Sequence, residues 1–179
     1  MKRCVMLLSF ALAVPAALLA QSGADIIRQQ GGGPMTKAQD VTFPAPTDLV
    51  YRIAWAVNVG PEKPDSVVPG FRATAGFFVT SDASGIPRRN VHQAIVVWGT
   101  ATQSLLKNEA YRKAKGTDNA SIALLQALND AGVKIIVCGV ALINRKIDAA
   151  DLLPFVKVAP TAQMGLATLN AQGYTTVRP

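Results

Sequence analysis

The sequence predicts an α/β fold, a three-layer α/β/α sandwich around a mostly parallel sheet of about five strands. Two observations predict it. Short segments with strand patterns alternate along the chain with segments whose apolar residues recur at helical spacing. One strand segment, Ala94–Val97, is apolar throughout, as expected of a strand that helices cover on both faces. Strands that are joined through helices in this way usually pair in parallel.

Residues 1–20 have the composition of a secretory signal peptide. Lys2 and Arg3 precede an apolar segment, Val5–Ala20, that is short for a membrane-spanning helix. Cleavage is expected near Ala20, although Leu18 stands where the cleavage site usually has a small residue. An uncleaved membrane anchor is the alternative. We therefore predict a periplasmic protein that has no stable membrane insertion after cleavage.

The rest of the chain is expected to form a lead-in and one domain. Residues 21–46 are polar, contain Gly31-Gly32-Gly33 and several prolines, and read as flexible apart from a short helix around Ala24–Gln30. Residues 47–179 have the length of a single domain. The net charge is +7, or +5 without the two basic residues of the signal segment. These charges are scattered and not interleaved with aromatic residues, which argues against nucleic-acid binding.

The first part of the domain is expected to contain a strand, a helix and a second strand. Leu49–Val59 alternates, with bulky side chains on one face (Tyr51, Ile53, Trp55 and Val57). Asp65–Ser81 has apolar residues at helical spacing, and Pro69 fits only its first turn. The second strand is expected over Val91–Trp98.

Three strands and four helices are expected in the remainder. Thr100 and either Asp118 or Asn119 are expected to cap two successive helices. The later elements are, in order, a strand over Val133–Val137, a helix from near Val140, a strand over Leu153–Ala159, a helix capped by Thr161 with Met164, Leu166 and Leu169 inward, and a strand over Tyr174–Val177.

Cys138 is the strongest candidate for a functional residue. Because Cys4 belongs to the signal segment, Cys138 is the one cysteine expected in the mature protein, and no intramolecular disulfide is expected. It follows a strand and precedes a helix, at the edge where α/β proteins usually place their chemistry. A helix amino terminus stabilises a thiolate, and Gly139 leaves room beside the sulfur. A buried, inert cysteine is the alternative.

The thiol is expected to have few polar neighbours. Trp98, Gly99, Gly139 and Val140 are the residues expected to border it, although Trp98 has the alternative of covering the sheet edge and packing on a helix. His92, the single histidine, opens its strand at the opposite edge of the sheet. This placement argues against a cysteine hydrolase, and the chain lacks the ligands of a zinc or copper site. No glycine-rich nucleotide motif occurs, so we expect no cofactor.

Four stretches resemble the DsrE/DsrF-like family, in particular its exported branch. They are YRIAWAV at 51–57, VVWGTATQSLL at 96–106, LLQALNDAGVKIIVCG at 124–139 and DLLPFVKVAPTAQMGLATLNAQGY at 151–174. The resemblance implies a three-layer sandwich that forms homo- or hetero-oligomers. It also implies sulfur transfer, because cytoplasmic relatives carry sulfur as a persulfide on a cysteine that matches Cys138. Exported relatives often have His-Gly at Trp98-Gly99 and a glutamine at Val140, so this chain lacks those polar groups.

Two functions follow from these observations. In the first, the protein is a periplasmic sulfur carrier rather than an enzyme with turnover of its own. The thiolate of Cys138 accepts sulfane sulfur as a persulfide and relays it to or from a thiol-bearing partner protein. In the second, the protein is a non-catalytic binding or assembly module, and a pocket beside Trp98 and an inert Cys138 holds an apolar group. Apolar surface on Phe71, Phe77 or Phe78 is expected to form the interface of a homo-oligomer.

Overall fold

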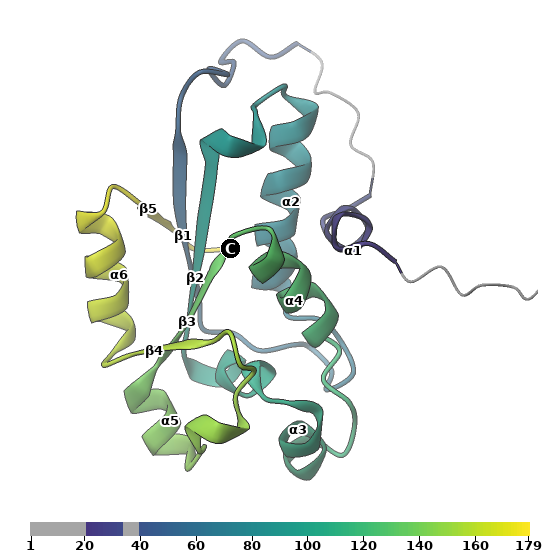
Figure 1. The fold of residues 1–179 in the computed structure, drawn as a ribbon, viewed down its shortest axis with the longest axis vertical. Coiled ribbons are helices and arrows are strands. Elements are labelled where there is room, and N and C mark those ends of the chain that lie inside the picture. The colour runs from purple at the N-terminus through teal and green to yellow at the C-terminus, as the bar shows by residue number, and fades with distance from the viewer. Residues whose placement is uncertain (1–20, 34–39) are drawn as a thin grey trace, which may run out of the picture.

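The computed structural model describes residues 21–33 and 40–179 and contains an all-parallel, five-stranded sheet between two layers of helices (Figure 1). The segment that reads as a signal peptide lies outside the described residues. In sequence order the strands are β1 (Tyr51–Val57), β2 (Val91–Val97), β3 (Lys134–Cys138), β4 (Lys157–Ala159) and β5 (Thr175–Val177). Across the sheet they are arranged as β4-β3-β2-β1-β5. The predicted α/β fold class is confirmed.

Helices cover both faces of the sheet. On one face lie α2 (Pro69–Ala83) and α4 (Ile122–Asp130), and α6 (Ala162–Ala171) lies on the other (Figure 1). The first helix, α1 (Gly23–Gln30), packs against α2 and α4 and buries Ile27. Two short helices, α3 (Asn108–Lys115) and α5 (Gly139–Arg145), follow the carboxyl ends of β2 and β3. Three 3₁₀ helices complete the fold: η1 (Arg88–Asn90), η2 (Gly99–Leu105) and η3 (Ala149–Asp151).

The two faces of the sheet bury different kinds of side chain, because successive residues of a strand point to opposite faces. Large side chains of the strands pack under α2 and α4, including Trp55, Ile95 and Val137, and this cluster forms the main core. The cluster under α6 contains smaller strand residues, Ala54 and Ala94 among them. This arrangement agrees with the bulky face predicted for the first strand. No described helix is long and apolar enough to cross a membrane.

Three predicted elements are wrong in extent or kind. The second helix begins at Pro69 rather than at Asp65, because proline is favoured in a first turn, where its missing N–H is not needed. The helix expected after Thr100 is divided into the 3₁₀ helix η2 and the α-helix α3, which ends before Gly116. The Thr100 hydroxyl accepts the N–H of Gly60 instead of capping an α-helix. The strand expected over Leu153–Ala159 is reduced to β4, because the Leu153 N–H donates to the carbonyl of Leu105.

The interaction surface predicted on the phenylalanines of α2 is wrong for Phe71 and Phe78, which are fully buried, whereas Phe77 is half-buried. Phe71 and Phe78 lie in the main core, and Phe77 packs edge-on against Tyr51 and Trp55. Their burial follows from the position of α2 across β1 and β2. Met164 of α6, predicted to point inward, is instead 58% exposed.

Asn119 connects two loops and does not cap a helix. Its side-chain Nδ2 donates to the carbonyl oxygens of Ser104 (2.9 Å) and Leu106 (2.8 Å). Its Oδ1 accepts the N–H of Ser121, the residue before α4, at 3.0 Å. The amide therefore joins the end of η2 to the start of α4 and supports the segment that follows β2.

Replacing this amide should destabilise the fold. Asn119→Ala leaves two buried carbonyl groups without their donor, so we expect the free energy of unfolding to fall by about 2–4 kcal/mol. Urea denaturation of the purified protein measures the change. The control is Asn129→Ala on α4, where the loss should stay within about 0.5 kcal/mol because no buried group loses its partner. Equal losses in the two variants would contradict the connecting function of Asn119.

Candidate functional site

Cys138 is the last residue of β3 and the residue immediately before α5. Its side chain is 6% exposed, and it is the free cysteine of the described residues. Gly139 follows at a position where a side chain would be crowded. A Cβ there would lie 3.0 Å from the carbonyl oxygen of Ala159 and 3.2 Å from that of Pro160. The absence of this side chain lets the segment after β4 pass beside α5, where the Val140 N–H donates to Pro160 O at 3.3 Å.

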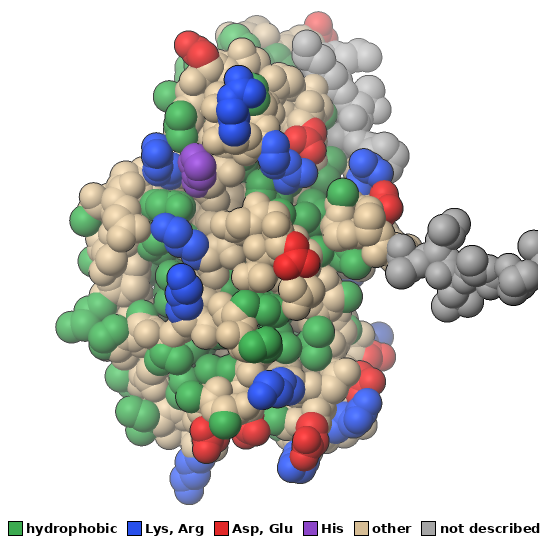
Figure 2. Space-filling model, in the orientation of Figure 1, with side chains coloured by type: hydrophobic (Ala, Val, Ile, Leu, Met, Phe, Trp, Pro, Cys, Tyr) green, Lys and Arg blue, Asp and Glu red, His purple; other side chains and the backbone are tan. Residues whose placement is uncertain are grey.

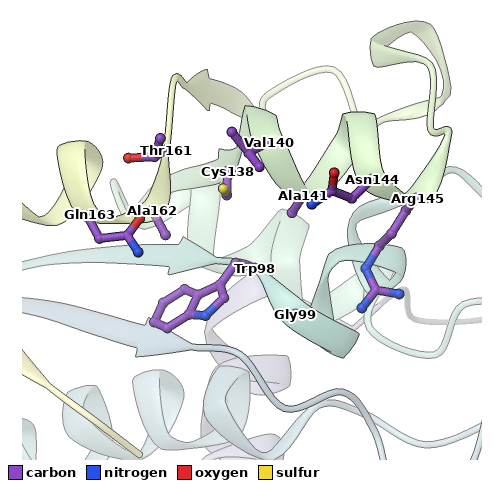
Figure 3. Close-up of a pocket in the computed structure, with 10 residues that line it drawn as sticks. All are labelled: Trp98, Gly99, Cys138, Val140, Ala141, Asn144, Arg145, Thr161, Ala162 and Gln163. Atoms are coloured by element: carbon purple, nitrogen blue, oxygen red, sulfur yellow. The ribbon is translucent and has the colours of Figure 1, made fainter.

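The sulfur lies in the wall of a pocket of about 510 Å³ at the carboxyl edge of the sheet. Three segments that are distant in sequence form this pocket (Figure 3). Trp98 and Gly99 come from the end of β2, and α5 contributes a second wall. The third wall is the start of α6, residues 161–163. A parallel sheet brings these segments together because its strands all end at one edge.

The structure brings Trp98, Gly99 and Val140 to the pocket that contains Cys138. Gly139 is not part of the lining and instead allows close backbone packing beside it. Trp98 is half-buried, and its indole also lines a neighbouring cavity of about 170 Å³ under α6. Both alternatives stated for Trp98 therefore apply, since its side chain packs under α6 and borders the thiol pocket.

Four polar residues of the lining do not appear among the predicted site residues. Asn144 and Arg145 project from α5, and Thr161 and Gln163 come from the opposite wall (Figure 3). Helical spacing could have predicted Asn144 and Arg145. They are four residues after Val140 and Ala141, two lining residues of the same helix. No local signal finds Gln163, since only the sheet order places α6 beside α5. Thr161 has its predicted capping function, accepting the Met164 N–H at 3.0 Å.

Arg145 is the one charged side chain among the described residues that line the pocket. His92 is exposed near the start of β2, paired in register with Arg52. It is six residues before Trp98, so it lies about 20 Å from the thiol edge at the usual strand rise. The structure thus agrees with the predicted separation of His92 from Cys138. No three His, Cys, Asp or Glu side chains of residues 21–33 and 40–179 are grouped as metal ligands.

Comparison with known families identifies the chain. Residues 56–179, which include β2 to β5 and the whole pocket lining, match the model of the DsrE/DsrF-like family. The chain belongs to the DsrE/DsrF-like family. This family is linked to sulfur relay.

A solved structure is also similar to this DsrE/DsrF-like chain. It is the protein of unknown function MTH1491 from Methanobacterium thermoautotrophicum, which has 17% sequence identity and a TM-score of 0.47. The alignment covers 72% of this chain and 99% of that one. A comparison with curated proteins finds no match.

Gly99 should be required for the backbone turn that places Trp98 in the wall of the pocket. Its φ of +58° is unfavourable for other residues, and a Cβ there would lie 2.5 Å from the Asn58 carbonyl oxygen. We expect Gly99→Ala to lower the free energy of unfolding by about 2–4 kcal/mol, as the sum of backbone strain and overpacking. Urea denaturation followed by tryptophan fluorescence measures this change.

Gly116 provides the matched control for that substitution. Its φ of +77° is similar, but a Cβ there meets nothing within 4 Å. Gly116→Ala should therefore show the backbone strain alone, about 1–2 kcal/mol. If both variants lose the same stability, the contact with Asn58 does not constrain the position of Trp98.

Proposed function

We propose that this DsrE/DsrF-like protein is a periplasmic sulfur carrier in which Cys138 holds sulfane sulfur as a persulfide. The observation that carries the proposal is the position of the thiol. It lies in the wall of a pocket at the carboxyl edge of the sheet, in a family linked to sulfur relay. The signal-like composition of residues 1–20 supports export to the periplasm.

The proposed chemistry consists of two displacements at sulfur. In the first, the Cys138 thiolate attacks the sulfane sulfur of a donor, a new S–S bond forms, and the donor's leaving group departs with the electron pair. In the second, the thiolate of a partner protein attacks the outer sulfur of the persulfide and releases the Cys138 thiolate. The steps balance without a cofactor. No acid or base other than the thiol itself is among the described lining residues, which favours a carrier over an enzyme with turnover.

The low exposure of Cys138 and the exposed apolar rim at Val140 favour a second candidate, a non-catalytic binding or assembly module. In this case the pocket beside Trp98 holds an apolar side chain of a partner, and the sulfur only contributes surface. Accessibility of the thiol in the folded protein separates the two candidates.

The test of the carrier is sulfur loading of folded protein that begins at Gln21. After treatment with polysulfide, intact-mass analysis should show a gain of sulfur that a reductant removes and that maps to Cys138. The control is Cys138→Ser, which should keep the same circular dichroism spectrum and gain no reducible sulfur. A native protein that does not load, and whose Cys138 is alkylated only after denaturation, would instead support the binding module.

A homo-oligomer remains part of the proposal, with a different surface. Large apolar side chains are exposed near the pocket on α5, β4 and α6, namely Val140 (44%), Ile143 (75%), Val158 (51%) and Met164 (58%). Figure 2 shows hydrophobic side chains gathered over the lower part of this view. Exposed apolar residues that lie beside an open edge strand are typical of subunit interfaces.

Charge introduced on this surface should separate the subunits. We expect Met164→Glu to shift the sedimentation coefficient of the oligomer to that of a monomer, because a carboxylate in an apolar interface is costly to desolvate. Leu49→Glu is the control, since Leu49 is 52% exposed but precedes the amino end of β1. If Met164→Glu sediments like the wild type, the interface lies elsewhere or the protein is a monomer.

A further inference from the structure

We propose that the sulfur donor is a small anion of the thiosulfonate class, R–SO₂–S⁻, bound with its sulfonyl oxygens on Arg145 and its terminal sulfur at Cys138. This inference rests on the proposed carrier function and names the substrate class of that site. Three features of the pocket carry it: its charge, the polar groups of its α5 and α6 walls, and its lack of an acid.

The first feature is the charge of the pocket. Arg145 lines it, and no carboxylate is among the described lining residues. No described carboxylate lies within ion-pair distance of this guanidinium. Arg145 is exposed to solvent, so its guanidinium is free to bind an anionic ligand at the pocket. A planar guanidinium has parallel N–H groups that can bind two oxygens of one oxyanion. A neutral or apolar sulfur donor would leave these N–H groups unused.

The second feature is a set of neutral hydrogen-bond groups on both sides of the thiol. Figure 3 shows Asn144 on the α5 side and Gln163 on the α6 side, with Cys138 between them. Neither amide makes a side-chain hydrogen bond to another described residue in this structure. Thr161 uses its oxygen to accept from Met164, so its own hydroxyl hydrogen stays available. These groups suit a ligand with several oxygen acceptors, and a sulfonyl group has two.

The third feature is the lack of a proton donor for the leaving group. Cys138 and Arg145 are the titratable residues among the described lining, and an arginine does not give up its proton. His92 is at the other edge of the sheet. A leaving group must therefore depart as an anion. A sulfinate is a weak base that does so readily, whereas an alkyl thiolate is more basic and leaves more slowly.

The step balances with these components alone. Cys138–S⁻ attacks the terminal sulfur of R–SO₂–S⁻, the bond between this sulfur and the sulfonyl sulfur breaks, and the electron pair leaves with R–SO₂⁻. The products are Cys138–S–S⁻ and the sulfinate, with two negative charges on each side. No proton, oxidant or reductant enters. Because both reactants are anions, the Arg145 cation also offsets the repulsion between them.

The experiment compares two sulfur donors on the folded protein. Benzenethiosulfonate is the anionic probe, which leaves one sulfur on Cys138 as a persulfide. A dialkyl trisulfide is the neutral probe, which leaves a mixed disulfide or trisulfide on Cys138 and releases the other fragment as an anion. Intact mass over time follows both products. Arg145→Gln should lower the second-order rate constant with benzenethiosulfonate by about 10- to 100-fold, as for a lost charge-assisted hydrogen-bonded pair. The rate with the trisulfide should change by less than about twofold, because this donor has no oxyanion for Arg145 to bind.

Two further variants make the result specific. Lys146→Gln removes the neighbouring positive charge, which is outside the lining, and should leave both rates within about twofold of the wild type. Arg145→Lys keeps a charge but loses the planar fork, so its rate with benzenethiosulfonate should be intermediate. An unchanged urea midpoint for the Arg145 variants shows that the fold is intact.

The outcomes separate this inference from the proposed function. If the wild type reacts with the trisulfide but not with benzenethiosulfonate, or if Arg145→Gln loads from benzenethiosulfonate at the wild-type rate, the donor class is wrong. The carrier then remains if polysulfide still loads Cys138. If Arg145→Gln and Lys146→Gln slow the reaction with benzenethiosulfonate equally, the effect comes from the overall positive charge. Such a result would contradict a binding site for the anion at Arg145. If neither donor loads the folded wild type, the carrier function fails, and the donor class fails with it.

Discussion

The parallel pairing of β2 with β1 on one side and β3 on the other is the constraint on which the rest of the structure depends. Val57 is opposite Val97, and Val97 is opposite Val137, so three strands end next to one another. The residues that follow them therefore meet at one edge, however far apart they are in sequence. A shift of one residue in β3 would turn its side chains to the other face and move the thiol away from α6.

The difference between the two faces of the sheet explains how a mostly buried thiol can border a pocket. Under α2 and α4 the large side chains close the core completely. Under α6 the buried strand residues include the small side chains of Ala54 and Ala94. Cys138 belongs to this second cluster, at its carboxyl edge, where α5 and α6 begin on either side. Cys138 therefore packs against the buried residues of this cluster and also lines the pocket at the carboxyl edge of the sheet.

The side chains that line the pocket suit the binding and orientation of a ligand. Trp98 contributes a large aromatic surface at a position where the resemblance leads one to expect an imidazole. The polar side chains that line the pocket are an arginine, two amides and a hydroxyl, as Figure 3 shows. Sulfur transfer is compatible with such a site because thiolate attack and anionic departure move no proton. The same site is poorly suited to hydrolysis, which needs a general base to activate water.

The sequence by itself determined the α/β class, the alternation of elements, the position of Cys138 at the end of a strand and the Thr161 cap. These features depend on local periodicity and on hydrogen bonds that span a few residues, so they can be predicted from neighbouring residues alone. Only the tertiary structure decided that Gly99–Leu105 is a 3₁₀ helix, that β4 has three residues and that Phe71 and Phe78 of α2 are buried. It also decided that Asn119 joins two loops and that Arg145 and Gln163 are in the same pocket. Each of these features depends on contacts between segments that are distant in the chain, such as the hydrogen bond from Leu153 to Leu105, and local sequence patterns carry no information about such contacts.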